Sequence, residues 1–193
     1  MHFRAVIFAF SIFCCTSAVQ AQSALDAQLA KALKSAPSPG GSHVAKPGGG
    51  ASQAAAAGWH VDNDGSKADQ PCGMTFASGG KAMGYIGPYK DWKDSYFFVT
   101  GSQIPATAKT KKVSVTLASQ GDSPQTVKAF HFPVKGGSAA FLFQLTNFAA
   151  ALDVMDDSEQ VSVQMNGTPV FDGSWTGGFA AREKVRACLL KAK

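Results

Sequence analysis

The histidines are the side chains of this sequence best suited to act as a general base near neutral pH. His43 lies in a stretch rich in proline and glycine, whereas His60 and His131 lie in segments with the alternation of a strand. A serine hydrolase also needs a serine and an orienting acid, and the G-x-S-x-G motif of an α/β-hydrolase is absent from the sequence. Because His131 shares a predicted strand face with Val127 and Ala129, we expect it to be a partly buried structural histidine rather than a base.

Two pairs of nearby carboxylates are candidates for glycosidase chemistry, Asp91 with Asp94 and Asp153 with Asp156. A glycosidase needs one carboxylic acid in an apolar setting, where burial raises its pKa. A lysine directly precedes each member of the first pair, which favours ionised and solvated acids. We therefore predict that the chain is not an enzyme. The alternative is a hydrolase that acts on cell-wall glycan.

Two of the four cysteines lie in an apolar N-terminal run, which leaves Cys72 and Cys188, 116 positions apart (188 − 72). An even pair in an exported protein is expected to form a disulfide. The two cysteines lack the C-x-x-C spacing of a metal site. Residues 60–65 resemble the start of a calcium loop, but Pro71 stands where calcium would need a bidentate Glu. We predict no metal and no other cofactor.

Aromatic residues are concentrated between positions 84 and 98. Residues 96–98 read as part of a strand, whereas Tyr89 and Trp92 belong to a polar connection rich in turn formers. An exposed aromatic pair can stack on a sugar or anchor a protein partner. Tyr89 and Trp92 are therefore the candidate binding residues. The alternative is that this loop folds back and its aromatic side chains cover one end of the core.

The N-terminus has the features of a secretory signal peptide: Arg4, an apolar run over residues 5–15, and small residues up to Ala21. We predict a signal peptide over residues 1–21, a short helix and flexible linker over 22–58, and a β-rich domain over 59–193. The apolar run is about half the ~20 residues that span a bilayer, and no later stretch comes closer. The mature protein is expected to have no membrane span and to be periplasmic or secreted from a bacterial cell.

Residues 23–34 carry Leu25, Leu29 and Leu33 at four-residue spacing, which predicts a short helix with one narrow apolar stripe. A helix of about 12 residues is marginal alone in water. Pro, Gly, Ala and Ser dominate residues 35–58, so that stretch is predicted to be a flexible linker. Disorder and docking onto a partner are both open for the helix.

Net charge gives no indication of a nucleic-acid partner. Residues 59–193 contain 14 Lys and Arg against 12 Asp and Glu, a net charge of +2 (14 − 12). So small an excess provides no strong electrostatic attraction for nucleic acid or anionic lipid. An envelope protein, a host protein or a glycan remains as the possible partner.

Alternating apolar and polar residues predict a mainly β, β-rich α+β fold, an antiparallel sandwich or barrel of about 7–8 strands with a C-terminal helix packed on it. Asn166-Gly167 between two such segments is a strong hairpin signal. Helices are predicted over 147–155 and 180–191. The predicted strands are 74–77, 82–86, 96–100, 112–118, 126–132, 139–145, 160–165 and 169–175.

Between Cys72 and Cys188 the sequence resembles small exported proteobacterial proteins of the invasion-associated locus B type. The matching pieces are Cys72, Ile104-Pro105 ahead of Val113-Ser114-Val115, Val161-Ser162-Val163, and the run from Gly173 to Ala181. The sequence departs from that pattern in its single mature cysteine pair and its long linker. A terminal helix with a late cysteine is also similar to periplasmic accessory proteins of secretion systems. The resemblance implies a non-enzymatic cell-envelope protein that binds a macromolecule or acts as an accessory module.

Overall fold

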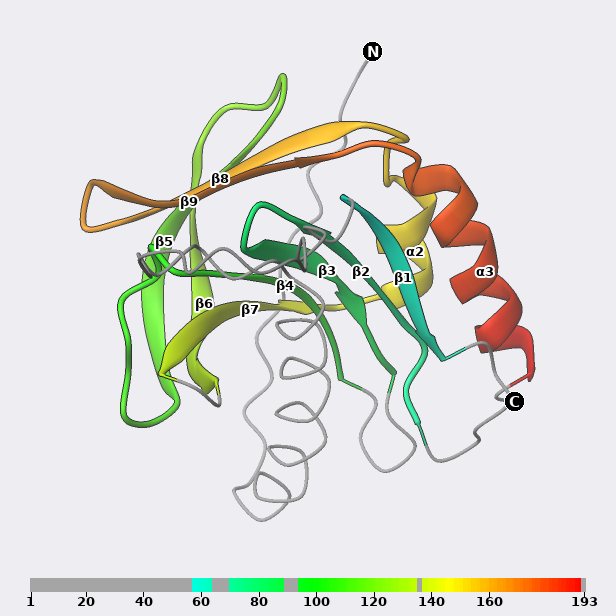
Figure 1. Cartoon of the computed structure of the whole chain (residues 1–193), viewed down its shortest axis with the longest axis horizontal. Helices are drawn as coiled ribbons and strands as arrows, with labels where there is room; N and C mark the ends of the chain where they lie inside the picture. The colour runs from blue at the N-terminus through cyan, green and yellow to red at the C-terminus, as the bar shows by residue number, and fades with distance from the viewer. Residues whose placement is uncertain (1–56, 64–69, 89–93, 135–136, 192–193) are drawn as a thin grey trace, which may run out of the picture.

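The computed structural model describes residues 57–63, 70–88, 94–134 and 137–191 of the chain. In this part nine strands form one antiparallel sheet, in the order β1-β2-β3-β4-β7-β6-β5-β8-β9 (Figure 1). The strands are β1 (Gly58–Asn63), β2 (Gly73–Ser78), β3 (Lys81–Ile86), β4 (Ser95–Gly101), β5 (Lys111–Ser119), β6 (Gln125–Val134), β7 (Ser138–Leu145), β8 (Glu159–Met165) and β9 (Thr168–Trp175). The predicted fold class is confirmed, with nine described strands instead of seven or eight.

The sheet curls into a half-barrel, so that strands far apart in the sheet order share one core (Figure 1). Phe76 of β2 and Phe171 of β9 belong to the same buried cluster as Val99 of β4 and Val115 of β5. We call this cluster, on the concave face, the inner cluster. Of the two architectures that the sequence left open, the curled single sheet corresponds to a barrel that does not close.

The alternation of apolar residues places the strands as predicted. In β8, Val161 and Val163 are buried, whereas Gln164 is exposed. Asn166 and Gly167 both have positive φ angles, 53° and 77°, and connect β8 to β9. Two positive φ angles match the twist of a two-residue hairpin, which explains the strength of the Asn-Gly signal.

Strand β4 is buried on both faces, since every one of its residues is buried. Phe97 and Val99 point into the inner cluster, whereas Tyr96 and Phe98 lie on the opposite, convex face. There they meet apolar residues of the neighbouring strands β3, β7 and β6. We call this second group the outer cluster; its members are Ile86, Tyr96, Phe98, Phe130, Phe132, Val134, Ala140 and Leu142.

Two helices are described, α2 (Phe148–Asp153) and α3 (Gly178–Lys191). Asn147 caps α2, because its side chain accepts a hydrogen bond from the Ala150 amide at 3.0 Å. Asp157 stands at the start of α3, where its carboxylate accepts a hydrogen bond from the Phe179 amide at 3.0 Å. A carboxylate at that end also complements the positive end of the helix dipole. Neither described helix is long and apolar enough to cross a membrane.

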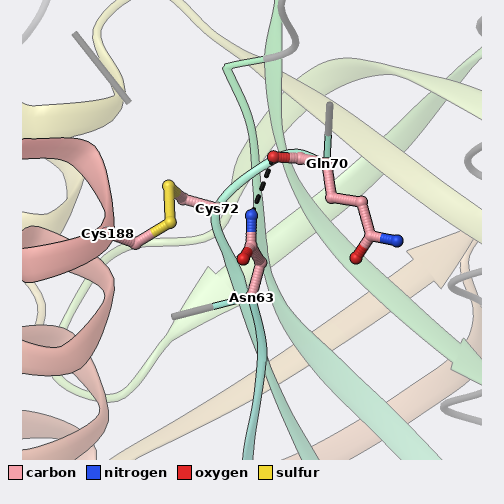
Figure 2. Close-up of a disulfide and its surroundings, with 4 residues drawn as sticks. All are labelled: Asn63, Gln70, Cys72 and Cys188. Carbon is pink, nitrogen blue, oxygen red and sulfur yellow. Dashed lines mark hydrogen bonds between the residues drawn. A yellow bond between two sulfur atoms is a disulfide. The ribbon is translucent and has the colours of Figure 1, made fainter. Parts of the chain in front are cut away.

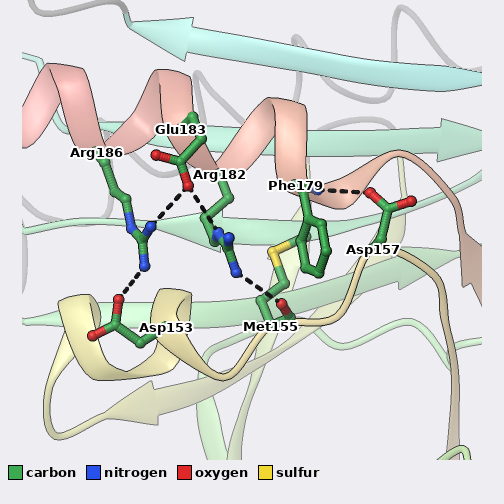
Figure 3. A network of polar contacts seen from close by, with 7 residues as sticks. All are labelled: Asp153, Met155, Asp157, Phe179, Arg182, Glu183 and Arg186. Carbon is green, nitrogen blue, oxygen red and sulfur yellow. Dashed lines mark hydrogen bonds and ion pairs between the residues drawn. The ribbon is translucent and has the colours of Figure 1, made fainter.

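Polar contacts join α3 to α2 and to the segment between α2 and β8 (Figure 3). Arg186 forms an ion pair with Asp153 at the end of α2 and a second one with Glu183. Arg182 donates a hydrogen bond to the carbonyl oxygen of Met155 at 3.3 Å. These pairs are partly exposed, so they orient α3 more than they stabilise it.

A disulfide joins Cys72, which immediately precedes β2, to Cys188 in the last turns of α3 (Figure 2). Both cysteines are buried in the inner cluster, together with Ala181 and Val185 of the same helix. The bond confirms the predicted pairing. It ties the C-terminal helix to the start of the sheet across a sequence separation of 116 residues.

We expect Cys188→Ser to lower the free energy of unfolding substantially, by up to roughly 5 kcal/mol, since a loop of this length greatly restricts the unfolded chain. Chemical denaturation of a chain of residues 22–193, the predicted mature form, measures the loss. The double variant Cys72→Ser/Cys188→Ser is the control, and its loss should be close to that of the single variant. If protein that is exported from the cell and purified without a reductant has titratable thiols at Cys72 and Cys188, the disulfide is contradicted.

Candidate functional site

The two edges of the curled sheet, β1 and β9, are joined by side chains instead of a backbone ladder. Trp59 of β1 donates a hydrogen bond from Nε1 to the carbonyl oxygen of Thr176 at 2.9 Å. Its ring centroid lies 5.8 Å from that of Trp175 at the end of β9. Farther along the opening, Lys81 Nζ of β3 donates to the carbonyl oxygen of Asp172 at 2.6 Å. These contacts hold the two sides of the opening together.

A groove of about 250 Å³ lies in this opening, between β9 and the hairpin formed by β2 and β3. Its floor is apolar, because Phe76, Met83 and Phe171 of the inner cluster line it. Polar residues and backbone surround that floor. The remaining lining residues are Ser78, Gly79, Lys81, Ala82, Asp172, Gly173 and Ser174.

Gly173 allows the floor of the groove to form. A Cβ atom at this position would lie 2.9 Å from Cζ of Phe171 and 3.0 Å from Cε of Met83. Any side chain would therefore displace Phe171 or Met83, two of the three residues that form the floor. A glycine inside a predicted strand is a signal of such a close approach, and it is the signal by which the groove could have been found in the sequence.

Strand β9 offers a row of backbone groups to the groove. The carbonyl oxygens of Asp172 and Thr176 are reached by Lys81 and Trp59, which come from the side opposite β8. Along an antiparallel strand, alternate residues direct both their N–H and C=O groups to the same side. The backbone groups of Ser174, midway between these two residues, therefore point into the opening as well.

This arrangement suits the binding of an extended polypeptide. An added strand can form backbone hydrogen bonds with the free edge of β9, while its alternate side chains enter the apolar floor. A lysine beside an edge strand is a common device against uncontrolled strand pairing. Lys81 has that position, because its ammonium group donates a hydrogen bond to the Asp172 carbonyl oxygen on the free edge of β9.

Among the described residues, His60 does not form a catalytic pair with a nucleophile. Its Nε2 lies 3.8 Å from Oδ1 of Asp62, and its side chain is largely exposed on β1. The hydroxyl group facing the same carboxylate is that of Thr75, which donates a hydrogen bond to Asp62 Oδ2 at 3.1 Å. Because the acid lies between the imidazole and the hydroxyl, this order is the wrong one for a base that activates a nucleophile.

His131 is more deeply buried than the partial burial that its strand pattern predicts, with 1% of its surface exposed. Its Nε2 donates a hydrogen bond to the carbonyl oxygen of Pro105 at 2.8 Å. The ring packs against Phe141, with centroids 4.9 Å apart. Burial lowers its pKa, and the positive charge of Lys111, which is paired with it across β5 and β6, acts in the same direction. The hydrogen bond to Pro105 opposes that shift.

Glu159 is an ionisable residue that sequence reasoning missed. Burial at the start of β8 raises its pKa, and the negative charges of Asp156 and Asp122 raise it further. A hydrogen bond from the Ser119 side chain acts in the opposite direction. Burial and the charge of Glu159 also raise the pKa of Tyr85. Glu159 is not among the residues that line the groove.

Of the four residues considered for glycosidase chemistry, Asp153 and Asp94 make structural contacts through their carboxylates, whereas Asp156 is held through its backbone. Asp153 is paired with Arg186, and the Asp156 carbonyl oxygen accepts a hydrogen bond from Trp175 Nε1 at 3.1 Å. Asp94 accepts a hydrogen bond from the Gln144 side chain at 2.9 Å. Asp91, the other member of that candidate pair, lies outside the described residues.

Tyr89 and Trp92, the candidate binding residues, also lie outside the described residues. The chain on either side of them is fixed. On one side the Gly87 amide donates to the Cys72 carbonyl oxygen at 2.9 Å, and on the other Asp94 is bound by Gln144. The binding role of the pair stays a prediction.

Within residues 57–63, 70–88, 94–134 and 137–191, no group of three or more His, Cys, Asp or Glu side chains is arranged to hold a metal ion. Comparison of the chain with protein-family models, with curated proteins and with solved structures found no match. What the groove and the edge of β9 can bind therefore follows from their geometry alone.

The buried imidazole predicts an acid-sensitive fold. Because the folded-state pKa of His131 is lowered, stability is fully present above its unfolded value of about 6.5 and is lost as pH falls from there toward the folded pKa. His131→Gln retains a donor for Pro105 but cannot be protonated, so the unfolding free energy of this variant should depend less on pH over that window. Urea denaturation at several pH values measures the difference. His60→Gln, at an exposed ring, is the control; an unchanged pH dependence in His131→Gln would contradict the assignment.

Proposed function

We propose that this protein is a non-enzymatic, exported protein of the bacterial cell envelope that binds an extended segment of another protein along the edge of β9. The observation that carries the proposal is the groove between β9 and the β2–β3 hairpin, which combines an apolar floor with outward-facing backbone groups. Peptide backbones and alternate apolar side chains are the ligand groups that such a groove can recognise.

Export is supported by the predicted signal peptide and by the Cys72–Cys188 disulfide, since disulfides persist in oxidising compartments. Periplasmic and secreted locations both remain within the proposal. Part of the sequence resembles exported invasion-associated proteins of the locus B type, and this resemblance also favours a binding or accessory role.

A glycan hydrolase is the second candidate, and Glu159 is the observation that favours it. A carboxylic acid whose pKa is raised by burial is what a glycosidase uses as its general acid. Two features weigh against this role. The Ser119 side chain already forms a hydrogen bond with the Glu159 carboxyl group. Glu159 also does not line the groove.

The binding proposal is tested with a photo-crosslinking side chain at Ser174, an exposed residue of β9 that lines the groove. In cells that export the protein, we expect this position to crosslink to another polypeptide. The same side chain at Thr126, exposed on β6, should give no such product. Adding Lys81→Met should increase the crosslinked fraction, because it frees the Asp172 carbonyl oxygen for an incoming strand.

Two results would contradict the proposal in different ways. If a crosslinker at position 92 forms a product and one at Ser174 does not, the partner binds near Tyr89 and Trp92. The groove would then not be the binding site. Release of soluble fragments from purified peptidoglycan by the mature protein, lost in Glu159→Gln, would replace the binding role by that of a hydrolase.

A further inference from the structure

The outer cluster forms a second apolar surface, separate from the groove. Its residues lie side by side in the register of four strands: Phe98 faces Leu142 across β4 and β7, and Leu142 faces Phe130 across β7 and β6. Phe98, Leu142 and Ala140 are only 4%, 3% and 0% exposed. Neighbouring side chains on one face of a sheet shield one another from solvent only in the plane of the sheet. Burial to this degree therefore requires another segment packed on top of that face.

The two described helices do not provide this cover. The buried side chains of α2, Phe148 and Leu152, belong to the inner cluster. Those of α3, which include Val185 and Cys188, belong to it as well.

We infer that the outer cluster is the docking surface for the protein's own N-terminal helix, predicted over residues 23–34, through Leu25, Leu29 and Leu33. This inference is independent of the groove and of the proposed partner. Alone, so short a helix would be marginal in water, and burial of its leucine stripe supplies the stabilisation that it lacks.

The dimensions of the two surfaces agree. Leu25 and Leu33 lie eight residues apart, which corresponds to about 12 Å along a helix. The outer cluster crosses four adjacent strands, which is about 14 Å at the usual strand spacing. One short helix laid across these strands therefore covers the cluster with its apolar stripe.

The connecting chain is long enough to reach. The 22 residues 35–56 (56 − 34) lie between the predicted helix and the first described residues, just before β1. A Gly-rich linker of that length has a root-mean-square span of about 26 Å. The path from β1 to the cluster crosses about three strand spacings, or about 14 Å. Such a tether places the helix near the surface at a high effective concentration.

Other apolar segments outside the described ranges fit less well. The apolar run at residues 5–15 belongs to the predicted signal peptide, which is absent from the mature protein. The segments 64–69 and 135–136 contain no large apolar residue. Residues 89–93 join β3 to β4 next to Ile86 and Tyr96, at one end of the cluster, and are too few to cover Phe132 and Val134 on β6.

A photo-crosslinking side chain at Leu29 of the mature protein tests the docking directly. We expect an adduct within the same chain, independent of protein concentration, that mass spectrometry places in peptides containing Phe98, Phe132 or Leu142. The control is the same side chain at Lys31, which lies on the opposite side of the predicted helix. An adduct between two copies, an adduct elsewhere on the sheet, or no adduct at all would overturn the inference.

A second comparison does not depend on crosslinking. Leu25→Asp/Leu29→Asp should lower the thermal midpoint by several degrees and increase the fluorescence of an apolar-surface dye several-fold, because the outer cluster becomes exposed. Ala24→Asp/Ala27→Asp adds the same two charges to the opposite side of the predicted helix and should change neither value. Equal behaviour of the two double variants would overturn the inference.

Discussion

Trp59 makes the contact on which the shape of the sheet depends. Nine strands form a continuous ladder, but β1 and β9 do not pair, so the curl must be maintained by side chains. The Trp59 ring packs edge-to-face on Phe76 and Trp175, with ring centroids 5.4 and 5.8 Å apart. Its Nε1 also donates a hydrogen bond to the Thr176 carbonyl oxygen. The disulfide and the apolar face of α3 reinforce the same end of the sheet. The lateral opening that remains is the groove.

Local pattern was enough to predict most of the elements. Alternation in β5 and β8, the Asn166-Gly167 turn and the single mature cysteine pair each gave a prediction that the structure confirms. All three are features of short sequence segments or of residue counting. The burial of His131, though not its depth, followed in the same way from its face of β6.

The site could not be predicted in this way, because it arises from contacts between distant segments. The groove requires β9 to lie opposite the β2–β3 hairpin, a placement fixed by the strand order and by contacts such as that of Lys81 with Asp172. Burial in the folded chain raises the pKa of Glu159, and so does the negative charge of Asp122, about 40 residues away in the sequence. The continuous apolar run Tyr96-Phe97-Phe98-Val99 did contain a signal for burial on both faces of β4, but not for what covers the outer one.

Binding in the groove requires that β9 is a free edge whose outward backbone groups border the groove. Amide hydrogen exchange of the mature protein, resolved by residue with NMR, measures this property directly. We expect slow exchange for the amides of Phe171 and Gly173, which face β8, and much faster exchange for that of Ser174, which faces the opening. Equally slow exchange at Ser174 and Gly173 would mean that the edge of β9 is already paired and is not available to an incoming strand.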